Sequence, residues 1–302
     1  MTEAYAPFPH RAPPLIPRFP HRRTPPTIGA VTHRQTDSLT EALSLSPHGE
    51  GQFLADVPDG WQQGRGAYGG LVLGLLAEAM DRTAAAETDR RMRTLSGELV
   101  APVLPGEALL RVFTVRRGAG ISSLRAELSQ GGVIAAHAHA LFGRDRVEGR
   151  DRVDLAPPPP PDLWRELEVL PVEPPIGPQF ARHFEFRTTG PLPFSQPPVP
   201  EAAGFVRAHR PPEQHSAATV IAHADAWWPT GFAAEEAPRP MATVSFNLQL
   251  FEDPALLPAQ TPFFHRSRML GSRGGYFLEV RELWTADGRL AALNPQTFAI
   301  IK

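Results

Sequence analysis

The sequence Gly64-Arg-Gly-Ala-Tyr-Gly-Gly70, followed directly by the apolar stretch Leu71–Ala85 (LVLGLLAEAMDRTAA), decides the fold. The glycines predict a tight turn from a strand into a helix, because glycine adopts backbone conformations that other residues avoid. The stretch after the turn is long and rich in Ala, Leu, Met and Glu, which favours a helix. A strand is expected before the turn, at Gly51–Val57. Together these features predict a strand, a turn and a mainly apolar helix.

Four segments with alternating apolar and polar residues follow this helix, and this alternation is typical of antiparallel strands. The expected strands are Thr94–Pro102, Ala108–Arg116, Ser122–Leu128 and Val133–Phe142. Gly131-Gly132 is a hairpin signal between the last two strands. The first block of the chain is therefore predicted to be an antiparallel meander that packs on one long helix.

A second block repeats this order. Its expected elements are strands at His183–Thr188 and Gly204–His209, a helix at His215–Trp228 that Pro229 stops, and strands at Thr243–Phe251, Pro262–Met269, Tyr276–Trp284 and Leu290–Ile301.

The two blocks also share residues in the same order. Thr94–Leu99 and Thr243–Leu248 have the pattern T-x-S-x-x-L in common, and Phe142 corresponds to Phe298. A lone sheet with one helix leaves much apolar surface exposed, so two copies that pack together complete the burial. We therefore predict an α+β fold built by duplication.

Composition narrows the function and places the boundaries. The chain has 302 residues, no Cys and a net charge of −2. Without Cys there are no disulfides, thiolate nucleophiles or cysteine metal sites, and the charge argues against a globally basic nucleic-acid binder.

The 35 prolines are more than twice the usual share of ~5%. They gather at both ends of the first block, which predicts an arm at 1–30, a folded block at 31–150, a linker at 151–177 and a folded block at 178–302.

The ordered set of motifs resembles the double-hotdog thioesterases of the acyl-CoA thioesterase II type. The resemblance rests on Asp59–Gly70, Leu99–Gly106 and Arg116–Gly118 in the first block. In the second block it rests on Ala224–Pro229, Met241–Ser245, Gly274–Tyr276 and Asp287–Ala291. It implies two tandem hotdog repeats, each an antiparallel sheet wrapped around a long helix, and an enzyme that hydrolyses acyl-CoA without a cofactor or metal.

The resemblance also implies a catalytic set in the second repeat. The family holds its hydrolytic water with an Asp on the helix, a hydroxyl at the start of the next strand and a Gln on the last strand. These positions correspond to Asp225, Thr243 and Gln296. Asp225 lies in an apolar segment, so burial is expected to raise its pKa unless hydrogen bonds offset the effect. Such a shift suits a general base near neutral pH.

Two further groups of residues are candidates for binding the substrate. Backbone N–H groups at Tyr68, Gly69 and Gly70, or at the equivalent turn of the second block, are expected to stabilise an oxyanion at a helix start. Arginines near the strand ends are candidates for the CoA phosphates; they are Arg116, Arg117, Arg268 and Arg273, with Arg266 beside them.

Several alternatives stay open at this stage. Glu78 and Asp81 follow the first glycine turn, so Glu78 is a candidate acid for a second site, although Ala140 stands where the second block has Gln296. His137 and His139 share one face of a strand and are interpreted as a surface pair rather than half of a metal site. The chain lacks the Asp-x4-His pair of hotdog hydratases.

The proposed partner is therefore an acyl-CoA substrate, with no nucleic acid and no membrane, and a homodimer is an open alternative. No apolar run is long enough to span a membrane and no secretory signal is evident, so a cytoplasmic location is expected. A non-catalytic protein that binds acyl-CoA or another hydrophobic ligand remains the main functional alternative. An assembly role for the proline-rich arm is a third interpretation.

Overall fold

The computed structural model describes residues 33–85, 89–146 and 149–301, and the chain from His33 onward forms one compact unit. The predicted arm at residues 1–30 lies outside the described residues.

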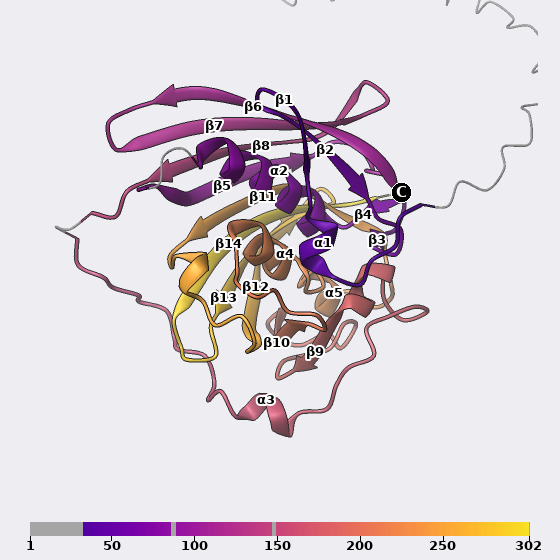
Figure 1. Cartoon of the computed structure of the whole chain (residues 1–302). Coiled ribbons are helices and arrows are strands. Elements are labelled where there is room, and N and C mark those ends of the chain that lie inside the picture. Colours follow the sequence, from indigo (N-terminus) through magenta and orange to yellow (C-terminus); the bar gives the residue numbers. More distant parts are fainter. Residues whose placement is uncertain (1–32, 86–88, 147–148, 302) are drawn as a thin grey trace, which may run out of the picture. The chain divides into compact units, whose positions relative to one another are not determined.

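The first half of this unit is a curved antiparallel sheet around one long helix (Figure 1). Its elements are α1 (Leu39–Ala42), β1 (Ser46–Gly49), β2 (Gln52–Val57), β3 (Gln62–Gln63), β4 (Gly66–Ala67), α2 (Gly69–Ala84), β5 (Arg91–Leu99), β6 (Gly106–Arg117), β7 (Ile121–Gln130) and β8 (Val133–Gly143).

The second half repeats the plan with a shorter helix. Its elements are α3 (Leu163–Glu166), the 3₁₀ helix η1 (Gln179–His183), β9 (Phe184–Thr188), β10 (Glu201–Ala208), α4 (Ala217–Asp225), α5 (Gly231–Ala234), β11 (Met241–Leu250), the 3₁₀ helix η2 (Pro254–Leu256), β12 (Phe263–Arg273), β13 (Tyr276–Trp284) and β14 (Leu290–Ile300).

The strands of both halves join into one continuous antiparallel sheet, except β3 and β4, which form a separate two-stranded sheet. Within the described residues the order of the continuous sheet is β1-β2-β6-β7-β8-β5-β11-β14-β13-β12-β10-β9. The halves meet where β5 pairs with β11, and the central pair of that junction is Ser96 with Asn247. These two residues are equivalent in the two repeats, because they lie four positions after Met92 and Thr243, which pair with the corresponding Phe142 and Phe298. The structural equivalent of Thr94 is therefore Ser245, so the alignment expected from the T-x-S-x-x-L pattern is wrong by two residues. The junction therefore has a pseudo-two-fold axis through this pair, and the predicted double hotdog fold is confirmed.

The two long helices cross against each other inside this sheet, and small residues make their close contact. A Cβ on Gly70 would lie 3.0 Å from the Ala222 Cα, and a Cβ on Gly74 would lie 3.2 Å from the Ala218 carbonyl oxygen. Most residues of α2 are buried, because one face meets the sheet and the other meets α4. This explains why the stretch after the glycine turn is apolar over most of its surface.

The segment predicted as a linker, 151–177, packs against the second half. It contains α3, whose Leu163 and Trp164 cover an apolar cluster on the outer face of the sheet that includes Phe205, Phe264 and Trp284. Trp164 lies under the guanidinium groups of Arg187 and Arg207, which are 4.7 and 4.5 Å from its ring centre.

The second helix is shorter than predicted. It begins with a capping box between Ser216 and Thr219 and ends at Asp225, whereas the sequence predicted helix as far as Trp228. Pro229 disfavours helical backbone in the residue before it, and Trp227 leaves the helix to stack on His265, with ring centres 5.2 Å apart. This early end places Asp225 in the last turn of the helix. None of the helices in the described part of the chain is long and apolar enough to cross a membrane.

Candidate active site

The structure brings Asp225, Thr243 and Gln296 together through hydrogen bonds. Asp225 ends α4, Thr243 lies near the start of β11 and Gln296 lies on β14. The Gln296 Nε2 amide donates to Asp225 Oδ1 over 3.0 Å, and the Thr243 hydroxyl donates to Gln296 Oε1 over 3.1 Å. Gln296 and Asp225 are buried, whereas Thr243 is partly exposed. The three side chains therefore form a short chain that leads from the protein interior toward the surface.

Two asparagines fix the orientation of the Gln296 amide. Asn294 Nδ2 donates to the Asn247 carbonyl over 2.6 Å, which turns Asn294 Oδ1 toward Gln296. Gln296 Nε2 then donates to that oxygen over 2.6 Å. A flipped Gln296 amide would set its oxygen against both Asn294 Oδ1 and the Asp225 carboxylate, so only one orientation satisfies all the groups.

Burial is the main influence on Asp225 and raises its pKa above the ordinary value. Three neighbours act in the opposite direction: the Arg281 guanidinium, the Gln296 amide and the backbone N–H of Gly70. The negative end of an Asp side chain is also favoured at the N-terminus of α2, where the helix dipole is positive. Asp225 is thus a desolvated carboxylate held by several donors, an arrangement that suits a general base.

The glycine turn before α2 packs directly on this carboxylate. A Cβ on Gly69 would lie only 2.7 Å from Asp225 Oδ2, and one on Gly70 would lie 3.0 Å from the Asp225 Cβ. Tyr68 is fully buried, and its ring stacks on Phe180 at 4.1 Å. Burial, and then the nearby Asp225 charge, raise the pKa of Tyr68 well above its usual value. The candidate site is therefore shared between the two repeats, with the carboxylate from the second and the helix start from the first.

The three predicted amide donors have different partners. The Tyr68 N–H donates to the Trp61 carbonyl over 3.0 Å, so it is already occupied. The Gly70 N–H faces Asp225. The Gly69 N–H has no hydrogen-bond partner among the described residues.

Two charged residues beside Asp225 were missed by the sequence analysis. Arg281 and Glu279 lie on β13 and are buried, and Arg281 Nη1 is 3.6 Å from Asp225 Oδ1. A signal was present in the sequence, since both residues alternate in phase with Phe277 and Leu283 and so share the inward face of the strand. Charged residues in the apolar phase of a strand indicate a buried polar site.

The four candidate arginines do not gather around the trio. Arg116 and Arg117 pair with Ser123 and Ser122, at the end of the first half-sheet that lies away from Thr243. Arg268 pairs with Val280, on the outer face of the sheet, opposite α4. Arg273 pairs with Tyr276, at the end of the sheet where Thr243 lies, and it is exposed.

The first repeat lacks the same polar set. Phe142 pairs with Met92 in the way that Phe298 pairs with Thr243, so Met92 occupies the place of the hydroxyl and Ala140 that of the amide. Glu78 forms an ion pair with Arg82, in which Glu78 Oε1 lies 2.8 Å from Arg82 Nε.

The remaining acid, Asp81, and the two strand histidines form no hydrogen bond or ion pair with the trio. Asp81 is partly exposed, and burial followed by the charge of Glu78 raises its pKa to about 7. His137 lies 3.3 Å from Glu98, and His139 contacts the Ser123 hydroxyl at 2.7 Å.

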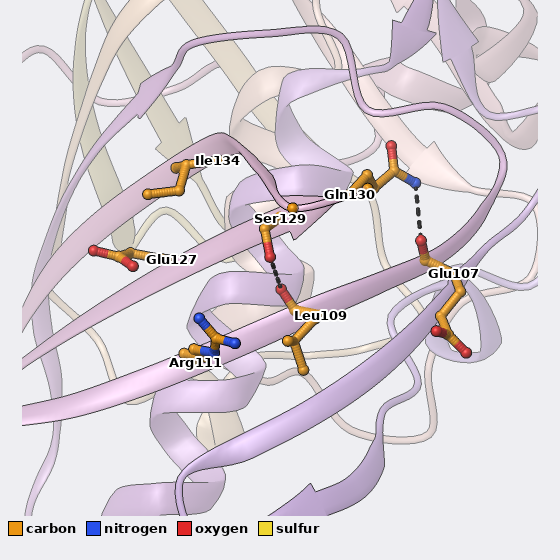
Figure 2. A pocket seen from close by; sticks show the side chains of 9 residues that line it. Glu107, Leu109, Arg111, Glu127, Ser129, Gln130 and Ile134 are labelled. Atoms are coloured by element: carbon orange, nitrogen blue, oxygen red, sulfur yellow. Dashed lines mark hydrogen bonds between the residues drawn. The ribbon is translucent and has the colours of Figure 1, made fainter.

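A surface pocket of about 290 Å³ lies on the outer face of β6 and β7. Figure 2 shows it lined by Glu107, Arg111 and Glu127, with Gln130 bonded to the Glu107 carbonyl. None of the predicted catalytic residues lines it. The candidate trio of Asp225, Thr243 and Gln296 therefore lies outside this hollow.

The sequence matches two family domains in order. Residues 57–143 match the acyl-CoA thioesterase N-terminal domain, and residues 152–300 match the acyl-CoA thioesterase C-terminal domain. The chain belongs to the acyl-CoA thioesterase family. The search of curated proteins found no match to this chain.

Solved structures agree with this family fold. A hot dog fold protein of unknown function from Alicyclobacillus acidocaldarius is 21% identical, has a TM-score of 0.77, and the match covers 90% of this chain and 99% of that one. A putative thioesterase II from Thermobifida fusca is 21% identical with a TM-score of 0.72, and the match covers 87% of this chain and 97% of that one. An acyl-CoA thioesterase II, TesB2, from Mycobacterium marinum is 17% identical with a TM-score of 0.69, and the match covers 87% of this chain and 98% of that one. At these identities the likeness establishes the fold.

Proposed function

We propose that this protein hydrolyses acyl-CoA thioesters to a free acid and CoA, with Asp225 as the general base. The observation that carries the proposal is the Gln296 side chain, which bonds to both Asp225 and Thr243 and is itself fixed by Asn294. Membership of the acyl-CoA thioesterase family supports the substrate class. A fatty acyl chain is the proposed acyl group.

The hydrogen-bond directions explain how a water would be held. The Thr243 hydroxyl gives its proton to Gln296 Oε1, so its lone pairs can only accept from a further partner. The Asp225 carboxylate also accepts. A water between them would donate one hydrogen to each, which leaves a lone pair on its oxygen directed away from both and toward the thioester carbonyl carbon. Asp225 would take one proton as the new carbon–oxygen bond forms.

The start of α2 would stabilise the negative charge that develops on the carbonyl oxygen. Of the three amides in the turn, that of Gly69 is the proposed donor, because the Tyr68 amide bonds to Trp61 and the Gly70 amide faces Asp225. The helix dipole adds to this effect. Collapse of the intermediate breaks the carbon–sulfur bond, and the proton held by Asp225 passes to the departing sulfur to give the CoA thiol.

Substrate anchoring is proposed for Arg273 among the four arginines, because it is exposed at the end of the sheet that contains Thr243. The CoA phosphates need cations at the mouth of the site.

The test measures free thiol release from acyl-CoA substrates of short, medium and long chain, for the wild type and Asp225→Asn. We expect turnover of at least one chain length and a loss of about 10³-fold or more in kcat for the variant, since removal of a general base typically costs 10²–10⁴-fold. Turnover that is unchanged in Asp225→Asn would overturn the site. Tight binding of acyl-CoA without turnover would instead identify a non-catalytic binding protein.

A further inference from the structure

The inner face of β13 presents a buried ion pair to the base. Arg281 Nε lies 2.5 Å from Glu279 Oε1, and Arg281 Nη1 lies 3.6 Å from Asp225 Oδ1. The exposed fraction is 1% for Arg281 and 0% for Glu279. The same Arg281 Nη1 donates to the Ala224 carbonyl in the last turn of α4 over 3.2 Å. Burial of two charges is costly, so the pair calls for an explanation beyond packing.

We propose that Arg281 and Glu279 act as a positioning pair for Asp225: Arg281 keeps the carboxylate charged, and Glu279 holds Arg281 back so that the carboxylate stays free to accept a proton. This inference rests on the proposed function of Asp225 as the base, and it deepens that function by naming what sets the charge of the base.

Arg281 provides the positive charge that keeps the Asp225 carboxyl ionised. Without its charge, Asp225 would be a buried carboxylate with a second acid, Glu279, close by, and two neighbouring carboxylates in a desolvated site cannot both ionise easily. An opposite charge within about 4–6 Å lowers a carboxyl pKa by about 1–3 units. Arg281 also donates to the Ala224 carbonyl at the C-terminus of α4, where a cation is favoured.

Glu279 has the opposite effect and is itself held in place. Its Oε2 accepts from the Thr230 backbone N–H over 2.8 Å, while Oε1 takes the short contact with Arg281. The Thr230 hydroxyl bonds in turn to Ser267 at 2.7 Å. Because Glu279 is the nearer carboxylate, Arg281 donates its short hydrogen bond to Glu279 and stays 3.6 Å from Asp225 instead of forming a hydrogen-bonded pair with it. Such a pair would weaken Asp225 as a base and occupy the oxygen that Gln296 contacts.

The other titratable groups around Asp225 carry no charge near neutral pH. His223, on the same helix, is buried and its pKa is lowered to about 4. His265 on β12 has its pKa lowered well below the usual value by burial and by Arg281. Tyr68 before α2 has a raised pKa. Arg281 and Glu279 are thus the charged neighbours of the base among the described residues.

The test compares Arg281→Met and Glu279→Gln by two readouts. The first is the pH profile of kcat/KM. The second, which needs no turnover, is the titration of the Asp225 carboxyl carbon by carbon-13 NMR, identified by its loss in Asp225→Asn. Arg281→Met should move both midpoints upward by about one to three pH units, and Glu279→Gln should move both downward by about one unit with a lower kcat. Arg281→Lys should restore part of the loss, because it keeps the charge.

The matched control is Glu282→Gln. Glu282 lies on the same strand and binds Arg266 at 2.5 Å, but on the outer face of the sheet. Opposite shifts in the two test variants, with no shift in this control, support the positioning pair. Equal shifts, or none, overturn it. If Arg281→Met does not fold, the downward shift in Glu279→Gln decides the question. If the wild type hydrolyses no thioester but the NMR midpoints move as stated, the proposed function fails and the electrostatic role of the pair stands.

Discussion

Replacement of Gly69 by alanine tests the geometry of the site most directly. Gly69 begins α2, and an added Cβ would lie 2.7 Å from Asp225 Oδ2 and 2.9 Å from Leu99 Cδ1. Contacts below 3.4 Å are already tight for a Cβ, so the carboxylate must move back by about 0.7 Å. Misplacement of a catalytic group by 1 Å costs about 10²-fold in rate, which gives a loss of about 25-fold, equal to about 2 kcal/mol of transition-state stabilisation.

The assay is thioester hydrolysis under saturating acyl-CoA, with the thermal midpoint measured on the same samples. Gly74→Ala is the matched control, because Gly74 lies in the same helix as Gly69, and a Cβ there would lie 2.7 Å from the Leu43 side chain and not against Asp225. It should lower stability by about 1–3 kcal/mol through overpacking and leave kcat within about twofold. Gly271→Ala, where a Cβ would meet nothing within 4 Å, should change neither quantity.

The result that would refute this reasoning is a folded Gly69→Ala protein with wild-type kcat. In that case the carboxylate could move without cost, and the close approach of the two repeats would not be part of the chemistry. An equal loss of kcat in Gly74→Ala would also refute it, because the effect would then come from general loosening of the helix pair.

Three further predictions concern stability. Asp225→Asn should raise the thermal midpoint at pH 7 while it removes activity, because a carboxyl whose pKa is raised by folding destabilises the native state once it ionises; a lower midpoint would contradict this. His215 and His223 are buried with pKa values of about 3 and about 4. The unfolded chain binds these protons below about pH 6.5, so each histidine should reduce the free energy of unfolding by about 1.4 kcal/mol per pH unit from there down to its folded pKa. Urea denaturation at pH 7 and pH 5 measures this slope, and His223→Gln should make it shallower. Trp164→Ala, which removes the ring beneath two arginines on the outer face, should cost about 1–3 kcal/mol in the same assay without a change in kcat.

Local patterns in the sequence were sufficient to predict most of the elements. The glycine turn and the helix after it were expected, and α2 begins at Gly69, only two residues before the predicted start. The strand predictions agree with the observed strands to within a few residues, because alternation of apolar and polar residues directly reflects which face of a sheet is buried. The end of α4 was predicted less well, since the packing of Trp227 on His265 is a contact between distant segments.

The candidate site was likewise predicted only in part from the sequence. Asp225, Thr243 and Gln296 were singled out through a family resemblance, and their residue types are evident in the sequence. Their hydrogen-bond directions are not, because the orientation of Gln296 depends on Asn294 and Asn247 from two other points of the sheet.

The sequence by itself determined the duplication, the elements of each repeat and the residue types available for chemistry, since these follow from local periodicity and composition. Only the tertiary structure decided how the repeats complete each other. The antiparallel junction of β5 with β11 and the crossing of α2 and α4 bring the glycine turn of one repeat onto the carboxylate of the other. The tertiary structure also places the Arg281–Glu279 pair beside Asp225. The charge state of a buried acid depends on such neighbours, which are distant in sequence and close in space.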